Sequence, residues 1–102
     1  MSVKNLLSNK TSAVTGDFEI LGNDGATFQA VGKTSSGSGS ATIDIEGSID
    51  KTNAVLLGTI TLSLSTSDST DGFYVSSNWP FVRAKLRSIS GTGSVINVFS
   101  RG

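Results

Sequence analysis

The chain has 102 residues, which is enough for one domain, and its eight basic and eight acidic residues cancel. A balanced charge provides no general attraction to nucleic acid or to an anionic membrane surface. Histidine and cysteine are absent, which excludes Cys/His zinc sites, disulfides, thiol nucleophiles and histidine-based acid–base chemistry. We therefore expect no enzyme, no metal site and no cofactor.

The composition and the N-terminus also bear on where the protein folds. Serine, threonine and glycine supply most of the polar residues, a mixture that suits short strands and tight turns rather than helices. The lack of disulfides in so small a domain favours folding in the reducing host cytoplasm. No apolar run approaches the roughly 20 residues of a membrane span, and the first ten residues lack the apolar core of a signal peptide.

Residues 1–16 show no sustained period, and we predict an extended N-terminal arm with Val3, Leu6 and Leu7 as anchors on a partner. A short amphipathic helix over residues 3–7 is the alternative. From Asp17 onward alternating segments predict strands at residues 17–21, 26–32 and 41–47, separated by a turn at 22–25 and a flexible loop at 33–40. The domain boundary is therefore placed between residues 16 and 17.

The stretch IEGSIDKTNAVLLGTI holds a polar segment, Gly47 to Asn53, between two apolar runs, and it predicts a strand reversal rather than a site. The strand that follows, residues 54–65, changes its pattern at Gly58, which suggests a bulge or a sharp bend. A loop at 66–72, a short strand at 73–76 and a strand at 81–89 come next. In that last strand the inward side chains are expected to be Val82, Ala84 and Leu86.

The final strand, residues 94–100, carries apolar residues at positions that point to both faces: Val95, Ile96, Val98 and Phe99. Both faces are therefore expected to be covered, one by the sandwich and one by a partner. Seven or eight short strands with loops every six to twelve residues predict a single antiparallel β-sandwich over residues 17–102. The immunoglobulin mark of a cysteine pair around a tryptophan is missing, so we predict a jelly-roll.

Several short patterns suggest chemistry that their surroundings do not support. Gly32-Lys33-Thr34 resembles part of a phosphate-binding loop, but the preceding glycine and the following helix are missing. Paired carboxylates such as Asp44 and Glu46 on one strand face serve glycoside hydrolases, yet no pocket is indicated beside them. Calcium ligands could come from Asp24, Asp68 and Asp71, but their spacing is that of turn-forming residues.

A basic stripe, Arg83, Lys85 and Arg87, occupies one face of one strand. It is either a solvated face or the partner of the acidic residues Asp44 and Glu46, across a strand pair or a subunit boundary. Just before it lies a group of aromatic residues. Packing, an interface anchored by Trp79, or a sugar platform are the possible roles of Phe73, Tyr74, Trp79 and Phe81.

The segments IEGSIDKTNAVLLGTITLSL, NWPFVRAKLRSISGTGSVINVF and the closing SRG resemble small virion proteins of tailed phages, of the capsid decoration or cement type. The resemblance covers residues 17–102. It departs at the hairpin, where the family pattern has Asp-Gly-Thr-Asn-Trp and this chain has Lys51 in place of the glycine and Ala54 in place of the tryptophan. The missing ring counts against any sugar stacking or core filling at position 54.

The resemblance implies a jelly-roll-like protein on the capsid surface that bridges neighbouring copies of the major capsid protein, commonly as a homotrimer. From the residues themselves, we expect the interface to use Val3, Leu6, Leu7, Asp44, Glu46, Trp79, Arg83, Lys85 and Arg87. Two alternatives remain open: a carbohydrate-binding or adhesion module of a phage fibre, which would use Trp79 with Tyr74, and a head–tail or baseplate connector.

Overall fold

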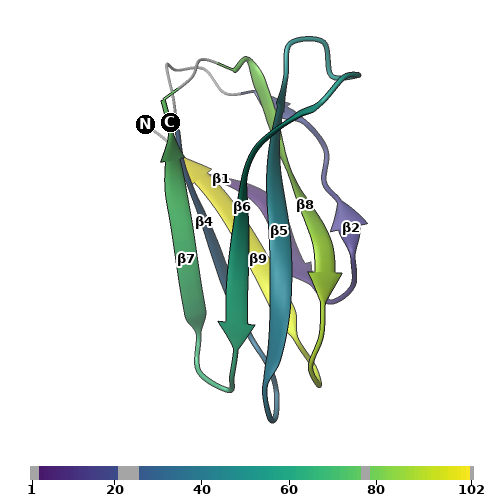
Figure 1. The fold of residues 1–102 in the computed structure, drawn as a ribbon, viewed down its shortest axis with the longest axis vertical. Helices are drawn as coiled ribbons and strands as arrows, with labels where there is room; N and C mark the ends of the chain where they lie inside the picture. The colour runs from purple at the N-terminus through teal and green to yellow at the C-terminus, as the bar shows by residue number, and fades with distance from the viewer. Residues whose placement is uncertain (1–2, 21–25, 77–78, 102) are drawn as a thin grey trace.

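The computed structural model describes residues 3–20, 26–76 and 79–101, and these form two antiparallel sheets packed face to face (Figure 1). The four-stranded sheet has the order β1 (Val3–Lys10), β9 (Val95–Arg101), β4 (Ala26–Lys33), β7 (Ser69–Val75). The five-stranded sheet has the order β2 (Val14–Thr15), β8 (Phe81–Ile89), β5 (Gly39–Ser48), β6 (Val55–Leu64), and β3 (Glu19–Ile20) also pairs with β8.

The strand order is that of a jelly-roll, as predicted. β2 and β3 both pair with β8, so they act as one interrupted strand and the sandwich has eight strand positions. Apart from the step from β2 to β3, only β5 and β6 follow one another within a sheet, and each other step along the described strands changes sheets. This alternation between layers is what two interlocked Greek keys produce.

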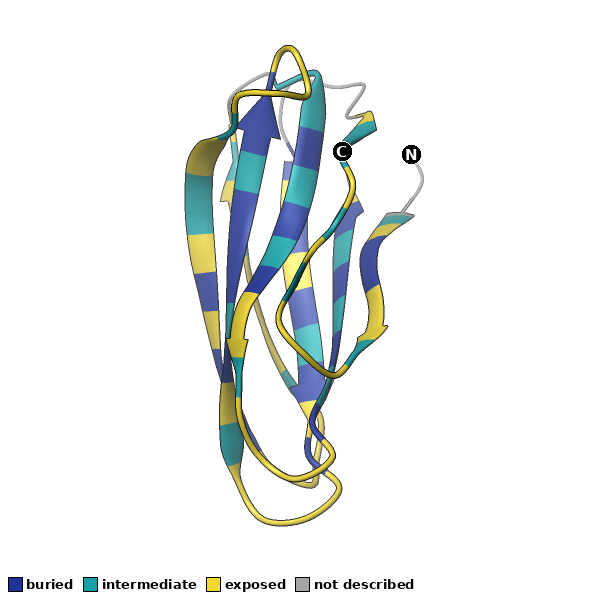
Figure 2. Ribbon diagram, turned by 90° about the vertical axis from the view of Figure 1, so that its right-hand side faces the viewer, coloured by how far each residue is buried: buried dark blue, intermediate teal, exposed yellow. Residues whose placement is uncertain are grey.

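The core lies between the two sheets and follows the period of two expected for strands (Figure 2). In β8 the predicted inward residues Val82, Ala84 and Leu86 are all buried, and in β5 Ile43 and Ile45 are fully buried. The four-stranded sheet contributes its own inward side chains to the same core: Ala26, Phe28 and Ala30 from β4, and Ile96 and Val98 from β9.

The N-terminal segment corrects the sequence prediction, because it is part of the sandwich rather than an arm outside it. β1 pairs with β9 from Val3↔Arg101 to Lys10↔Ile96. Two register shifts interrupt this pairing, and they let the consecutive residues Leu6 and Leu7 both turn into the core, where they are 7% and 2% exposed. The strand therefore lacks the alternation that would have revealed it in the sequence.

The β5–β6 connection is a strand reversal, as predicted, and Asp50 organises it. One Asp50 carboxylate oxygen accepts the backbone N–H groups of Asn53 and Thr52, both at 2.9 Å. These hydrogen bonds, with those from the Asn53 amide and the Ser48 hydroxyl, hold the pKa of Asp50 far below the usual carboxyl range. Lys51 takes φ +63°, the left-handed conformation that the glycine of the phage pattern adopts easily.

Two features of β6 and β7 refine the predictions. The register passes from Ile45↔Gly58 to Glu46↔Leu56, so the predicted irregularity at Gly58 is a bulge, and β6 stays in one sheet. Gly58 also makes room for a ring, since a Cβ there would lie 2.6 Å from Cζ of Phe73. β7 begins at Ser69 rather than at Phe73, because the polar residues predicted as a loop pair with the end of β4.

Candidate functional site

The outer face of the five-stranded sheet carries a charged ladder, which we define as Asp44 and Glu46 on β5 with Arg83 and Arg87 on β8. Arg83 Nε lies 2.7 Å from Glu46 Oε1, and Arg87 Nε lies 3.2 Å from Asp44 Oδ2. Asp44 is buried and also accepts a hydrogen bond from the Thr59 hydroxyl at 3.0 Å. Of the two roles left open for the basic stripe, pairing across strands is the one that Arg83 and Arg87 take, within one chain.

The remaining contacts of the ladder tie the N-terminal strands to the sheet. Phe18, between β2 and β3, lies under the Arg83 guanidinium, whose carbon is 4.5 Å from the ring centre. Lys85 is half-buried and stands opposite Asp44 on β5 and Thr15 on β2. Both carboxylates are held in ion pairs, so this face is organised to hold strands together rather than to act as a pair of catalytic acids.

A second feature, the apolar end, is defined by four exposed residues beside the β5–β6 turn: Ile20, Ile49, Val55 and Leu56. Strand pairing brings them to one end of the sandwich, because Ile20 pairs with Phe81, Phe81 pairs with Ser48, and Gly47 pairs with Val55. Ile49 is 75% exposed and Leu56 57%. Exposed apolar side chains gathered in this way are typical of a contact surface.

Lys51 and Trp79 border the apolar end. The Lys51 ammonium lies 4.7 Å from the centre of the Phe81 ring. Trp79 is half-buried and packs against the core, and a Cβ on Gly47 would lie 2.8 Å from Cδ2 of its indole. The alternative of a sugar platform made by Trp79 with Tyr74 does not form, since Trp79 packs against the core whereas Tyr74 lies on the outer face of the four-stranded sheet.

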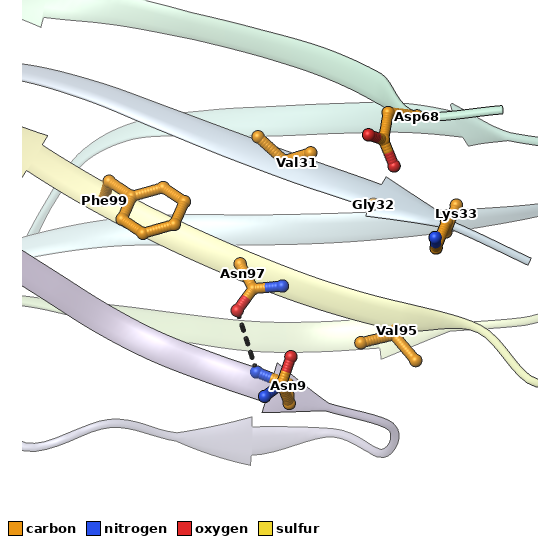
Figure 3. A pocket seen from close by; sticks show the side chains of 8 residues that line it. All are labelled: Asn9, Val31, Gly32, Lys33, Asp68, Val95, Asn97 and Phe99. Carbon is orange, nitrogen blue, oxygen red and sulfur yellow. Dashed lines mark hydrogen bonds between the residues drawn. The ribbon is translucent and has the colours of Figure 1, made fainter.

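The third feature, the sheet groove, runs over that outer face along β4 and β9. It consists of two shallow hollows of about 330 and 360 Å³ that share Phe99, and Figure 3 shows the first of them. The first is lined by Asn9, Val31, Gly32, Lys33, Asp68, Val95, Asn97 and Phe99, and the second by Thr27, Gln29, Phe99, Ser100 and Arg101. Tyr74 adjoins the second hollow as the strand partner of Thr27.

Two amides in the sheet groove are already oriented by the protein. The Asn97 Oδ1 accepts the backbone N–H of Asn9 at 3.0 Å, and its NH₂ points away from Asn9 in Figure 3. The Gln29 NH₂ donates to the Thr70 hydroxyl at 2.9 Å, which leaves its carbonyl oxygen as an acceptor. These residues escaped the sequence analysis, although Val95 and Phe99 were the signal, as apolar residues on the second face of the last strand.

The other predicted site residues are dispersed. Leu6 and Leu7 lie in the core, so they are not surface anchors, and the side chain of Val3 lies outside the description. Asp68 lines the sheet groove, Asp71 accepts the N–H of Gly72 at 2.8 Å, and Asp24 and the 22–25 turn lie outside the described residues. In the part of the chain that is described, no three acidic residues gather as a metal site would require.

Gly32 and Lys33 end β4, and the Thr34 hydroxyl donates to the Gly37 carbonyl in the loop to β5, so this segment is a strand end and a turn. Over residues 3–20, 26–76 and 79–101 no helix has the length and apolarity that crossing a bilayer demands.

Comparison with known proteins identifies one similar fold. No protein-family model and no curated protein sequence matches this chain. The crystal structure of PBSX exported protein XepA is similar, with a TM-score of 0.54 and 12% sequence identity. The similarity covers 97% of this chain and 36% of XepA, so the chain spans about a third of that protein. At this identity the likeness shows a shared fold.

Proposed function

We propose that this chain is a non-catalytic structural protein of a phage particle, and specifically a decoration or cement protein that bridges neighbouring copies of the major capsid protein. The observation that carries the proposal is the apolar end, where Ile49, Val55 and Leu56 are exposed at the same end of the sandwich. When a partner covers exposed apolar side chains, the free energy falls by about 25 cal/mol for each Å² of apolar surface removed from water.

Two further observations support the proposal. The charged ladder is satisfied within the chain, so it stiffens the sandwich instead of offering reactive groups. XepA, which shares the fold, is a phage protein, and the jelly-roll order agrees with the resemblance to phage virion proteins. A cement protein needs a rigid body, surfaces that contact capsid subunits, and many copies whose weak contacts add through avidity.

The residues that we assign to the capsid contact differ from the first expectation. Leu6 and Leu7 hold the core together, and Arg83, Arg87, Asp44 and Glu46 hold the strands. The contact is assigned instead to the apolar end, with Trp79 and Lys51 at its border. Self-association, with a trimer as the expected state, would cover part of the same surface. The proposed location of the protein is the outer surface of the capsid.

The test is reconstitution on particles that lack the protein. Purified chain is added to such capsids, and its copy number is measured by quantitative mass spectrometry against the major capsid protein. We expect a large simple ratio for the native chain and a loss of at least tenfold in occupancy for the double variant Ile49→Ser, Leu56→Ser. The matched control is Thr61→Ala, an exposed position on β6 away from the apolar end.

The copy number on native particles separates this role from its competitors. A dozen or fewer copies per particle would assign the chain to a connector or a fibre. Complete absence from particles would overturn the virion role, and equal occupancy of the double variant would overturn the assignment of the contact to the apolar end. The oligomeric state is measured separately by native mass spectrometry of the free chain.

A further inference from the structure

We infer that the sheet groove is a binding site for a neutral oligosaccharide, laid along β4 and β9 with Phe99 at its centre. This inference goes beyond the capsid role and does not depend on it, because the groove and the apolar end are separate surfaces. In the sequence, Trp79 with Tyr74 was the alternative location for a sugar platform, whereas the groove uses a different set of residues.

The backbone beneath the sheet groove is already fully used by the sheet. β4 is paired with β7 on one side and with β9 on the other, over Thr27 to Gly32. β9 is paired with β1 and β4. An extended peptide could not add itself here as a further strand, since strand addition requires a free edge. A ligand in the groove must be held by side chains alone.

The side chains along the groove combine one apolar surface with neutral polar groups. Phe99 is half-buried between the two hollows, and Tyr74, 64% exposed, flanks the end near Thr27 and Arg101. Asn97 offers its NH₂ and Gln29 its carbonyl oxygen, each fixed by a hydrogen bond to the protein. Fixing these groups before binding reduces the entropy lost when a ligand arrives.

A sugar ring is the chemistry that fits this arrangement. Its C–H face packs on an aromatic ring, while its hydroxyl groups both donate and accept hydrogen bonds and so suit an amide donor next to an amide acceptor. From Thr27 to Lys33 the strand rise of about 3.3 Å per residue gives a groove of about 20 Å, long enough for several sugar units. The ligand is therefore expected to be a chain rather than a monosaccharide.

The charges at the groove argue for a neutral ligand. Lys33 and Arg101 are accompanied by Asp68, so the charged residues that line the groove sum to only +1. Single-stranded nucleic acid, the other ligand that stacks on aromatic rings, uses a strongly basic groove with successive aromatic side chains. The two charged groups near Asn97, Lys33 and Asp68, lie at one end and are placed to bond hydroxyl groups at the terminus of the sugar chain.

The experiment titrates the ¹⁵N-labelled full chain with chitohexaose, cellohexaose and maltohexaose and follows backbone amide shifts. We expect saturable shifts confined to β4, β9 and the end of β7 for at least one of these sugars. Phe99→Ala should weaken that binding by roughly tenfold, as expected for the loss of a stacked ring. Gln29→Leu removes the acceptor at nearly constant volume and should weaken it severalfold.

The controls separate recognition from general stickiness and from misfolding. Leu56→Ala removes an exposed apolar side chain at the apolar end and should leave sugar affinity unchanged. Tyr74→Ala, at an exposed position, tests the platform without entering the core, should Phe99→Ala fail to fold. No shifts with any of the three sugars at millimolar concentration would overturn the inference. Shifts in the groove with an oligothymidylate alone, sensitive to salt, would assign it to nucleic acid instead and equally overturn it.

Discussion

The two outer faces of the sandwich use their polar side chains in opposite ways. On the five-stranded sheet, the two ion pairs found among the described residues bind β5 to β8, and both acidic partners are largely covered. On the four-stranded sheet, amides and rings border an open groove, and the charged groups stand at its ends. The charged groups on the five-stranded sheet are bonded to one another, whereas the amides on the four-stranded sheet keep unused donors and acceptors.

This difference separates polar side chains with a structural role from those that are free to bind a ligand. A polar side chain that is buried and partnered contributes to holding strands in place, whatever its type suggests in the sequence. A polar side chain that is oriented by one hydrogen bond and still has unused donors or acceptors can bond water or a ligand. Asp44 belongs to the first kind and Asn97 to the second, although both are short polar residues on strands.

The largest expected loss of stability comes from changes in β1, the strand that pairs with β9 beneath the groove. Leu7→Ala deletes a buried side chain at the junction of β1 with the core and should lower the free energy of unfolding by about 2 to 5 kcal/mol. Deleting residues 1–15 removes β1 and β2 together and should abolish cooperative folding. Urea denaturation followed by tryptophan fluorescence measures both.

The control for this prediction is Ser8→Ala, at the exposed neighbouring position of β1, with an expected change within about 0.5 kcal/mol. A truncated chain that still unfolds cooperatively with the native midpoint would show that β1 is dispensable. The N-terminal residues would then be an appendage to the sandwich, as the sequence suggested.

The sequence predicted the fold well where strands alternate regularly. The alternation of β5 and β8 predicted which residues face inward, together with the bounds of β8, while β5 extends one or two residues beyond the predicted 41–47 at each end. The missing cysteine pair led to the prediction of a jelly-roll. β1 was missed because its bulges place Leu6 and Leu7, consecutive in sequence, on the same side. A bulge depends on tertiary packing, and no local pattern in eight residues reveals it.

The candidate sites were less predictable because a site on a sheet depends on register. The charged ladder could be anticipated, since opposite charges on two alternating strands have an obvious pairing. The sheet groove joins Gln29 to Phe99, seventy positions apart, through the β4–β9 register, which the sequence does not contain. The apolar residues Val95 and Phe99 on the outer face of the last strand indicated only that this face is covered by a partner, without naming the other residues of the groove.

A smaller effect is expected for the two ion pairs on the five-stranded sheet, whose coupling free energies can be measured by double-mutant cycles. Glu46→Gln and Arg83→Met, alone and together, should give a coupling free energy of roughly 1 to 2 kcal/mol, because both side chains are mostly covered and the contact is short. The same cycle on Asp44 and Arg87 should give a smaller value, under about 1 kcal/mol, because the Arg87 side chain is 56% exposed. Unfolding in urea at low and high salt measures both couplings, and the reverse ranking would contradict our account of the ladder.

The smallest effect tests the open face with two neighbouring residues on β7 that point in opposite directions. Tyr74→Ala removes an exposed ring from the outer face and should change the free energy of unfolding by no more than about 0.5 kcal/mol. Phe73→Ala removes a ring that packs against Phe28, with ring centres 5.7 Å apart, and should cost about 3 kcal/mol. If thermal unfolding showed equal losses for the two variants, Tyr74 would be part of the structural packing, and its face would not be one that the fold leaves free for a ligand.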